Sequence, residues 1–352
     1  MNKNKIPENK TMSNNKLPNK MEAPFPKSTS LSDKVKLLME VMTHEDALAI
    51  IINADPDAMA SAMALKRLFW RRVRKTSIYH SNVIKRADNL AMINLLKLDQ
   101  KHIRKLKPQN FTKFAIVDSQ PSHNEQLSKY NFDIIIDHHP FVTQSQATFL
   151  EIKEDYGATS SIMTEYLRAA GIKPSPRLAT ALFYGIKTDT DNFVRDSTPG
   201  DINAFRYLFQ FINVNIIKKI ESSELTKNTL QNYKTAMENL IFVKDKVLIP
   251  MDNVSNPDNL VLMADFFLKM AEITWSVAAG IIGKKLVIIF RNAGFRLDAG
   301  KVAKKLFGEY GSAGGHKSAA RAEIPLSNIE SELSEGADYV QFIVSKLKGL
   351  KS

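Results

Sequence analysis

Three apolar runs of this sequence each lead to aspartate, and this pattern constrains the fold more than any other feature. The runs and the polar residues after them are 49–52 with Asp55 and Asp57, 114–117 with Asp118, and 134–136 with Asp137, His138 and His139. In an open parallel sheet, ligands bind beyond the carboxyl ends of the strands. Carboxylates and imidazoles brought there from separate strands suit hard metal ions, and such sites hydrolyse phosphate esters. The pattern therefore predicts a metal site at one edge of a parallel sheet.

Length and composition limit the classes of protein to consider. By length, 352 residues indicate about two domains, each with its own core. The chain has no cysteine, which excludes disulfides, zinc ribbons, iron–sulfur clusters and thiol nucleophiles. No apolar stretch reaches the roughly 18 residues that span a bilayer, and the N-terminus lacks the apolar region of a secretory signal. We therefore expect a cytoplasmic protein without a membrane partner.

The positive charge is unevenly distributed. The net charge is +12, and residues 1–30 contribute +4 of it through six lysines and two glutamates. That segment is rich in Lys, Asn, Pro and Ser, has little to bury, and is predicted to be a disordered basic tail. It could touch RNA, but a solvating extension is the simpler interpretation. The charge of the rest favours a polyanionic substrate.

Strand patterns alternate with helical patterns to about residue 195, which predicts a doubly wound, mainly parallel α/β domain over 31–199. A helical linker is expected over 200–242 and a smaller α/β domain over 243–352. The first domain should contain strands 47–53, 77–83, 114–117 and 133–136, helices 58–72, 90–97, 157–170 and 176–185, and a polar turn at 188–191. The second should contain helices 257–270, 298–307 and 327–348, strands 275–282 and 286–290, and a glycine-rich segment at 311–316.

Each polar motif also has a purely structural interpretation. An aspartate after a strand often caps a helix, and Asp55 and Asp57 flank Pro56 just before one. Residues 157–160 alone are better explained as a helix N-terminus than as a phosphate clamp. The glycines at 314–315 could equally be a helix C-cap or a phosphate contact. Aspartates at three strand ends, with a histidine pair, favour the metal site.

Five motifs in this order resemble those of the DHH phosphoesterases. They are 53–58, similar to the family's H-x-N-P-D-x-D motif, 117–119, Asp137-His138-His139, 184–190, similar to YGI-x-TDT, and 314–320, similar to the GGH-x-x-AA signature of the DHH-associated C-terminal domain. Family II pyrophosphatases end in an S-R-K-K signature that this sequence lacks. RecJ-type exonucleases carry an extra oligonucleotide-binding domain for which this length leaves no room. The resemblance is thus to the short members of the family, which degrade oligoribonucleotides and dephosphorylate adenosine bisphosphate.

The resemblance implies a role for each site residue. Asp118 would bridge two divalent ions, with Mn²⁺ expected, Asp57, His138 and Asp189 would complete one ion, and Asp55 would hold the other. Water activated by the ions would attack phosphorus. His139 would face the substrate phosphate, stabilising charge or protonating the leaving oxygen, and Asp137 would orient a histidine. The substrate would be bound by Arg291, Gly314, Gly315 and His316. A short RNA or a nucleotide is the expected partner, and a homodimer is one option.

The sequence departs from the family pattern at two positions. Ile51 stands where the family has a metal-binding histidine, so the first metal site would be weakened, with Asn53 or water filling in. Arg321 replaces a glycine of the C-terminal signature, which bears on a local turn. The first departure supports an alternative function, a DHH protein that binds nucleotides or nucleic acid without turnover. An active hydrolase is favoured because the other predicted ligands are present.

Overall fold

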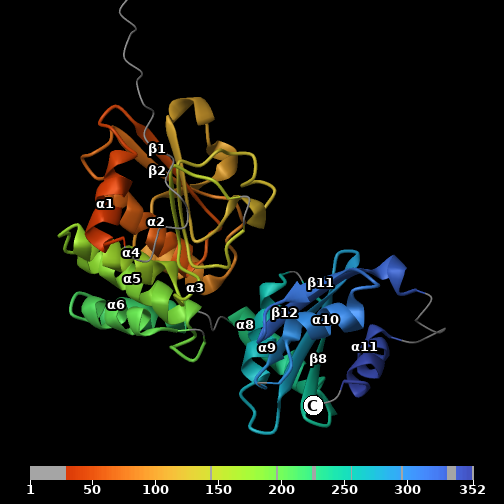
Figure 1. Cartoon of the computed structure of the whole chain (residues 1–352). Helices are drawn as coiled ribbons and strands as arrows, with labels where there is room; N and C mark the ends of the chain where they lie inside the picture. The colour runs from red at the N-terminus through yellow and green to blue at the C-terminus, as the bar shows by residue number, and fades with distance from the viewer. Residues whose placement is uncertain are drawn as a thin grey trace, which may run out of the picture. The chain divides into compact units, whose positions relative to one another are not determined.

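The computed structural model describes residues 29–142, 145–195, 197–223, 227–254, 256–294, 296–330 and 338–350 (Figure 1). Most of the expected basic tail, residues 1–28, lies outside this part of the chain. The chain divides into two compact units. The first ends at Lys219, and the second begins at Ile220 and also includes Lys85–Leu90. Each unit contains one six-stranded sheet. In the described part, no helix is long and apolar enough to cross a membrane.

The first sheet is parallel throughout and has the strand order β3-β2-β1-β4-β5-β6. Its strands are β1 Ala47–Ile52, β2 Lys75–His80, β3 Gln100–His102, β4 Lys113–Val117, β5 Ile134–Asp137 and β6 Phe149–Ile152. The order reverses between β1 and β4, the switch point at which open α/β sheets bind ligands. This is the doubly wound fold that the sequence predicted. Prediction missed the short edge strands β3 and β6.

Helices and irregular segments cover opposite faces of this sheet. The helices before residue 210 are α1 Leu31–Glu40, α2 Pro56–Leu68, α3 Ala87–Leu95, α4 Thr159–Ala169, α5 Pro176–Asp189 and α6 Pro199–Phe209. Helices α2, α4 and α5 pack against one another (Figure 1). On the other face, Ile51 is fully buried with Phe111, Leu127 and Phe132, which come from short turns. The predicted polar turn at 188–191 is partly helical, because α5 continues to Asp189.

Helices α7 Val214–Ser222 and α8 Lys227–Glu238 lie in the expected linker, around the boundary of the units. The second sheet is mixed, with the order β11-β12-β10-β9-β8-β7. Its strands are β7 Ile241–Val243, β8 Lys246–Asn253, β9 Trp275–Ile282, β10 Lys285–Asn292, β11 Ser312–Gly315 and β12 Ala319–Pro325. Helix α9 Asp258–Phe267 covers one face, while α10 Ala299–Phe307 and α11 Tyr339–Lys348 cover the other.

Two predictions for the second unit need correction. The glycines at 314–315 are not a helix C-cap, because α10 ends at Phe307 and Gly315 pairs with Ala320 in an antiparallel ladder. The terminal helix does not start at 327. Residues 326–328 form a 3₁₀ turn, Ile329 is fully buried in the core, and α11 starts only at Tyr339, while residues 331–337 lie outside the described part. Burial of Ile329 fixes the chain there, and an amphipathic helical pattern does not reveal such an anchor.

Candidate metal centre

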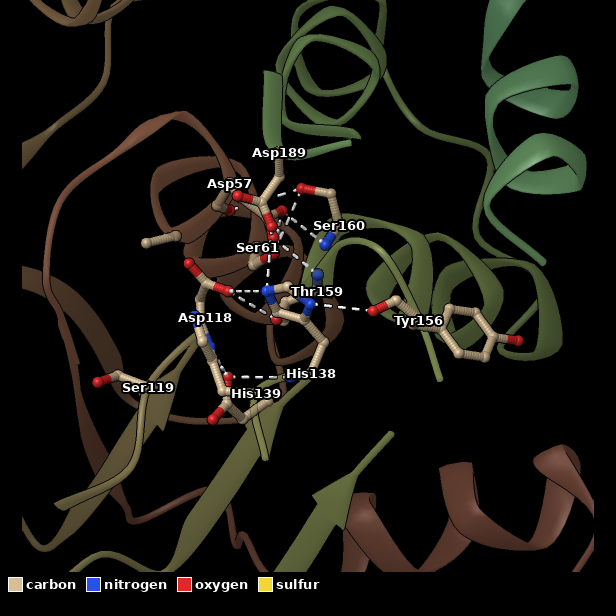
Figure 2. A network of polar contacts seen from close by, with 12 residues as sticks. Asp57, Ser61, Asp118, Ser119, His138, His139, Tyr156, Thr159, Ser160 and Asp189 are labelled. Carbon is tan, nitrogen blue, oxygen red and sulfur yellow. Dashed lines mark hydrogen bonds and ion pairs between the residues drawn. The ribbon is translucent and has the colours of Figure 1, made fainter. Parts of the chain in front are cut away.

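Four predicted metal ligands meet beyond the carboxyl edge of the first sheet (Figure 2). Asp57 lies in the first turn of α2, Asp118 follows β4, His138 follows β5, and Asp189 is the last residue of α5. Ligand atoms of Asp57, His138 and Asp189 all lie within 4.8 Å of one another, and so do those of Asp118, His138 and His139. Residues up to 132 positions apart in the chain are thus assembled as the resemblance implied.

The side chain of His138 is held in the orientation of a metal ligand. Its Nδ1 lies 3.0 Å from the carbonyl oxygen of Tyr156, so Nδ1 donates and Nε2 is left as the outward-facing atom. Nε2 lies 3.0 Å from Asp189 Oδ2 and 3.5 Å from Asp118 Oδ1. It is buried and makes no hydrogen bond of good geometry. A buried ring nitrogen among carboxylate oxygens fits a cation at this place.

Asp57 is fixed by the start of helix α4. The backbone amides of Thr159 and Ser160 donate to its two carboxylate oxygens at 2.7 Å each, and the Thr159 hydroxyl donates to Asp118 Oδ1 at 2.8 Å. The positive N-terminal end of α4 therefore favours the charged form of the Asp57 carboxylate. The structure supports the helix N-terminus interpretation of residues 157–160, because these amides bind Asp57 and are not left free for a phosphate.

Gly185 explains why the motif at 184–190 contains a glycine. A Cβ atom at this position would lie 2.6 Å from Ser160 Oγ and 3.1 Å from Asp57 Cα. Helix α5 can therefore approach α2 and α4 closely only without a side chain there. This approach brings Asp189, one turn further along α5, to the metal centre.

Asp118 adopts an unusual backbone conformation. Its φ is 59°, in the left-handed region that non-glycine residues occupy only at some energetic cost. Its side chain is almost fully buried and accepts the hydrogen bond from Thr159. Such local strain is common at binding and catalytic sites.

Asp137 and His139 form a second, connected pair. The fully buried Asp137 accepts hydrogen bonds from His139 Nδ1 at 2.8 Å, from the His138 amide at 2.9 Å and from Gln120 Nε2 at 2.8 Å. Burial acts against the charged forms, but the mutual attraction lowers the pKa of Asp137 and raises that of His139. Asp137 is thus placed to orient His139 and to favour the protonated form of its imidazole.

Asp55 has a different environment from the other aspartates. Its Oδ1 accepts a hydrogen bond from the Ala58 amide at 2.9 Å, so it caps α2, as its position before Pro56 suggested. It also lines a cavity of about 140 Å³ with Asp118 and His139. Within the described residues, no group of three close ligand atoms includes Asp55. Its role as a ligand of the first metal stays a prediction.

The carboxylates of the site crowd one another. Burial, followed by the charges of Asp189 and Asp57, raises the pKa of Asp55 to about 7. Burial and the neighbouring carboxylates also raise the pKa values of Asp57 and Asp118. Burial opposes protonation of His138, but Asp189 and Asp57 raise its pKa to about 10. A divalent cation would relieve this repulsion, and oxygen and imidazole donors suit Mn²⁺ or Mg²⁺. The residues therefore fit the expected metal.

The predicted substrate-binding residues lie together at one end of the second sheet. Arg291 of β10 pairs with Ala319 of β12, and Gly315 of β11 pairs with the adjacent Ala320. Arg291 is bound by Asp265, with 2.5 Å between Nε and Oδ1. A Cβ on Gly315 would collide with the Ala319 carbonyl oxygen.

By contrast, a Cβ on Gly314 would meet nothing within 4 Å, and the neighbouring His316 is exposed. Gly315 is thus required by packing, while Gly314 and His316 are open to a ligand.

Sequence reasoning did not assign four polar residues to the site. Gln120 is fully buried, and its Nε2 supports Asp137. Thr159 and Ser160 support Asp57, and His123 lines the cavity. The first three have local signals only, such as their positions after a strand or at a helix start. His123 lies in a short 3₁₀ turn, Pro121–His123, whose proximity to His139 depends on the folding of the sheet.

Residues 48–186 match the model of the DHH family, N-terminal domain. These residues form a DHH-family domain. An uncharacterized protein of Methanocaldococcus jannaschii is 37% identical over 306 residues, which cover 85% of this chain and 63% of that protein. The chain thus spans somewhat less than two thirds of the length of this relative.

Two solved structures share the fold. An exopolyphosphatase-related protein from Bacteroides fragilis has a TM-score of 0.70 at 16% identity, covering 92% of this chain and 98% of that one. RecJ from Thermus thermophilus in complex with Mn²⁺ has a TM-score of 0.51 at 11% identity, covering 92% of this chain and 55% of that one. At these low sequence identities, the similarity shows only that this chain and the two solved structures have the same fold.

Proposed function

We propose that this protein is a metal-dependent phosphoester hydrolase that acts on short oligoribonucleotides or on nucleotide phosphates such as adenosine 3′,5′-bisphosphate. The observation that carries the proposal is the convergence of Asp57, Asp118, His138 and Asp189 around one buried point. The DHH-family domain and the basic character of the chain support it.

Asp57, His138 and Asp189 would hold one divalent cation, and Asp118 would bridge to a second one beside Asp55. Mn²⁺ is the expected ion, and RecJ, which shares the fold, was solved in complex with it. When bound, such cations lower the pKa of water to make a nucleophile and neutralise charge on the phosphate. The Asp55 oxygen that does not cap α2 is the one free to take part.

His139 would act as the general acid. Its Nδ1 is bound to Asp137, so Nε2 is the atom able to reach a substrate. The hydrogen bond to Asp137 and its charge raise the pKa of His139 against the effect of burial, which favours the protonated ring. As the bond from phosphorus to the leaving oxygen breaks, Nε2 would give that oxygen its proton. Arg291, Gly314, Gly315 and His316 would bind a further phosphate of the substrate, for which Arg291 would have to be shared with Asp265.

The test combines elemental analysis of the purified protein with turnover of RNAs of two to five nucleotides in the presence of Mn²⁺. We expect bound divalent metal and hydrolysis that falls by several orders of magnitude in Asp118→Ala. Unchanged turnover in this variant would contradict the assignment, because no other residue is proposed to bridge.

One observation favours the alternative, nucleotide binding without turnover. Ile51 is fully buried in an apolar cluster and offers no donor, and Asp55 already caps a helix. Tight binding of a single metal, nucleotide binding and no hydrolysis of any short RNA or bisphosphate would support this alternative.

A further inference from the structure

His123 lies in the cavity of the candidate site, although no motif includes it. The cavity is also lined by Asn53, Asp55, Asp118, Ser119, Asn124 and His139. The rings of His123 and His139 are 5.5 Å apart between centroids, with an angle of 77° between their planes. Two imidazoles therefore face the same small polar space, and the proposed general acid is one of them.

The hydrogen bonds of His123 determine which nitrogen is available. Its Nδ1 lies 3.3 Å from the Gln120 backbone nitrogen, which can only donate, so Nδ1 is an acceptor. The hydroxyl oxygen of Ser119 is at the same distance from Nδ1. A neutral ring that accepts at Nδ1 carries its proton on Nε2. Among the described residues nothing accepts a hydrogen bond from that nitrogen.

We propose that His123 binds a phosphoryl oxygen of the substrate by donating its Nε2 proton. This inference rests on the proposed function and adds a residue to its substrate site. A neutral donor beside a charged oxygen makes a strong hydrogen bond without adding a charge to the crowded site. In this arrangement His139 supplies the proton that is transferred, while His123 keeps its own and positions the phosphate.

A competing role for His123 is that it replaces the imidazole missing at position 51 as a metal ligand. Two observations argue against this role. Possible ligand atoms of His123 lie within 4.8 Å of those of Asp137 and His139. In the described part of the chain, no such group of three contains both His123 and Asp118. Metal binding through Nε2 would also place the proton on Nδ1, where the Gln120 amide already points.

Two substitutions distinguish the roles of the two ring nitrogens of His123. His123→Asn keeps an acceptor near the Nδ1 position and removes the Nε2 donor, while His123→Gln places an amide donor near Nε2. His102→Asn is a matched control, because His102 Nδ1 also accepts from a backbone amide, that of Arg104, but His102 is not part of the cavity lining. Thermal melting checks that each variant is folded.

Calorimetry measures the binding of orthophosphate to the Mg²⁺-loaded protein. Steady-state kinetics give the KM for a 5′-phosphorylated diadenylate, and electron paramagnetic resonance gives the affinity for Mn²⁺. In His123→Asn we expect the phosphate dissociation constant and KM to rise roughly tenfold or more, with Mn²⁺ affinity unchanged. His123→Gln should recover part of the loss, and His102→Asn should behave as wild type.

Wild-type phosphate binding in His123→Asn would overturn the proposal, and so would weakened Mn²⁺ binding, which would make His123 a ligand. If the wild type hydrolyses nothing but binds phosphate through His123, only the proposed hydrolase fails. If the wild type does not bind orthophosphate at all, the role of His123 fails as well.

Discussion

Asp118→Asn should make the metal-free protein more stable while removing its activity. Asp118 is almost fully buried, and burial, followed by the charges of Asp57, Asp55 and Asp189, raises its pKa. Two like charges about 5 Å apart repel by about 3 kcal/mol at an effective dielectric constant near 20. Partial protonation reduces this value, and loss of the contact with His138 at 3.5 Å opposes it.

Asparagine keeps the acceptor for the Thr159 hydroxyl, so little else is lost. A net gain of about 1–2 kcal/mol remains, which corresponds to a rise in Tm of roughly 2–8 °C for a unit of this size. In excess Mn²⁺ the order of stability should reverse, with the wild type more stable than the variant. At about 100 times its Kd, Mn²⁺ would stabilise the wild type by about 2.7 kcal/mol and the variant far less.

The assay is thermal melting with and without Mn²⁺ after chelator treatment. Asp133→Asn is the control, because Asp133 lies at the start of β5 and pairs with Lys113 at 2.9 Å, away from the site. It should lose a little stability and keep the full response to Mn²⁺. A metal-free Asp118→Asn protein less stable than wild type, or equally stabilised by Mn²⁺, would refute the reasoning.

Four further substitutions test other parts of the structure. Gly185→Ala should lower kcat at least tenfold, because its Cβ would collide with Ser160 Oγ at 2.6 Å; unchanged kcat would mean that the close approach of α5 is not needed. Arg291→Ala should raise the KM for short 5′-phosphorylated RNA roughly tenfold and leave the KM for a small chromogenic diester little changed. Asp265→Asn should lower the KM for the RNA, because Asp265 pairs with Arg291. Equal damage of both substrates by Arg291→Ala would place it in the chemistry or the fold. Ile51→His should lower the free energy of unfolding by about 1–3 kcal/mol in melting experiments, since it buries an imidazole in an apolar cluster. Tighter Mn²⁺ binding by this variant would show that the side chain at position 51 reaches the metal centre and does not lie in the apolar cluster.

The sequence predicted the centre of the first sheet and the residues at its carboxyl edge well. Long apolar runs such as 49–52 can be buried in few ways, and the direction of parallel strands then brings their following residues together. The same logic placed Asp118 and His138 correctly beside one another. The motif at 184–190 correctly indicated that Asp189 belongs to the site. The prediction placed Asp189 in a turn, whereas it is the last residue of helix α5.

What sequence reasoning missed depends on tertiary contacts. Strand β3 has three residues and β6 four, too short for a periodic signal. Which ring nitrogen of His123 is free is decided by the Gln120 amide, and no sequence pattern reports that contact. Likewise, the buried Gln120 is polar and would have been assigned to the surface by composition alone.

The double attachment of Asp57 has a consequence for how such a protein can diverge. Its carboxylate joins the first turn of α2 to the amides of Thr159 and Ser160, about a hundred residues away along the chain, so it supports the fold as well as the site. Asp189 is more exposed and lies at the end of its helix. In a lineage that gave up hydrolysis, substitutions at Asp189 would be tolerated early, while Asp57 would be retained by selection for folding alone. An intact aspartate at position 57 of a relative is therefore weak evidence for catalysis, and an intact Asp189 is strong evidence.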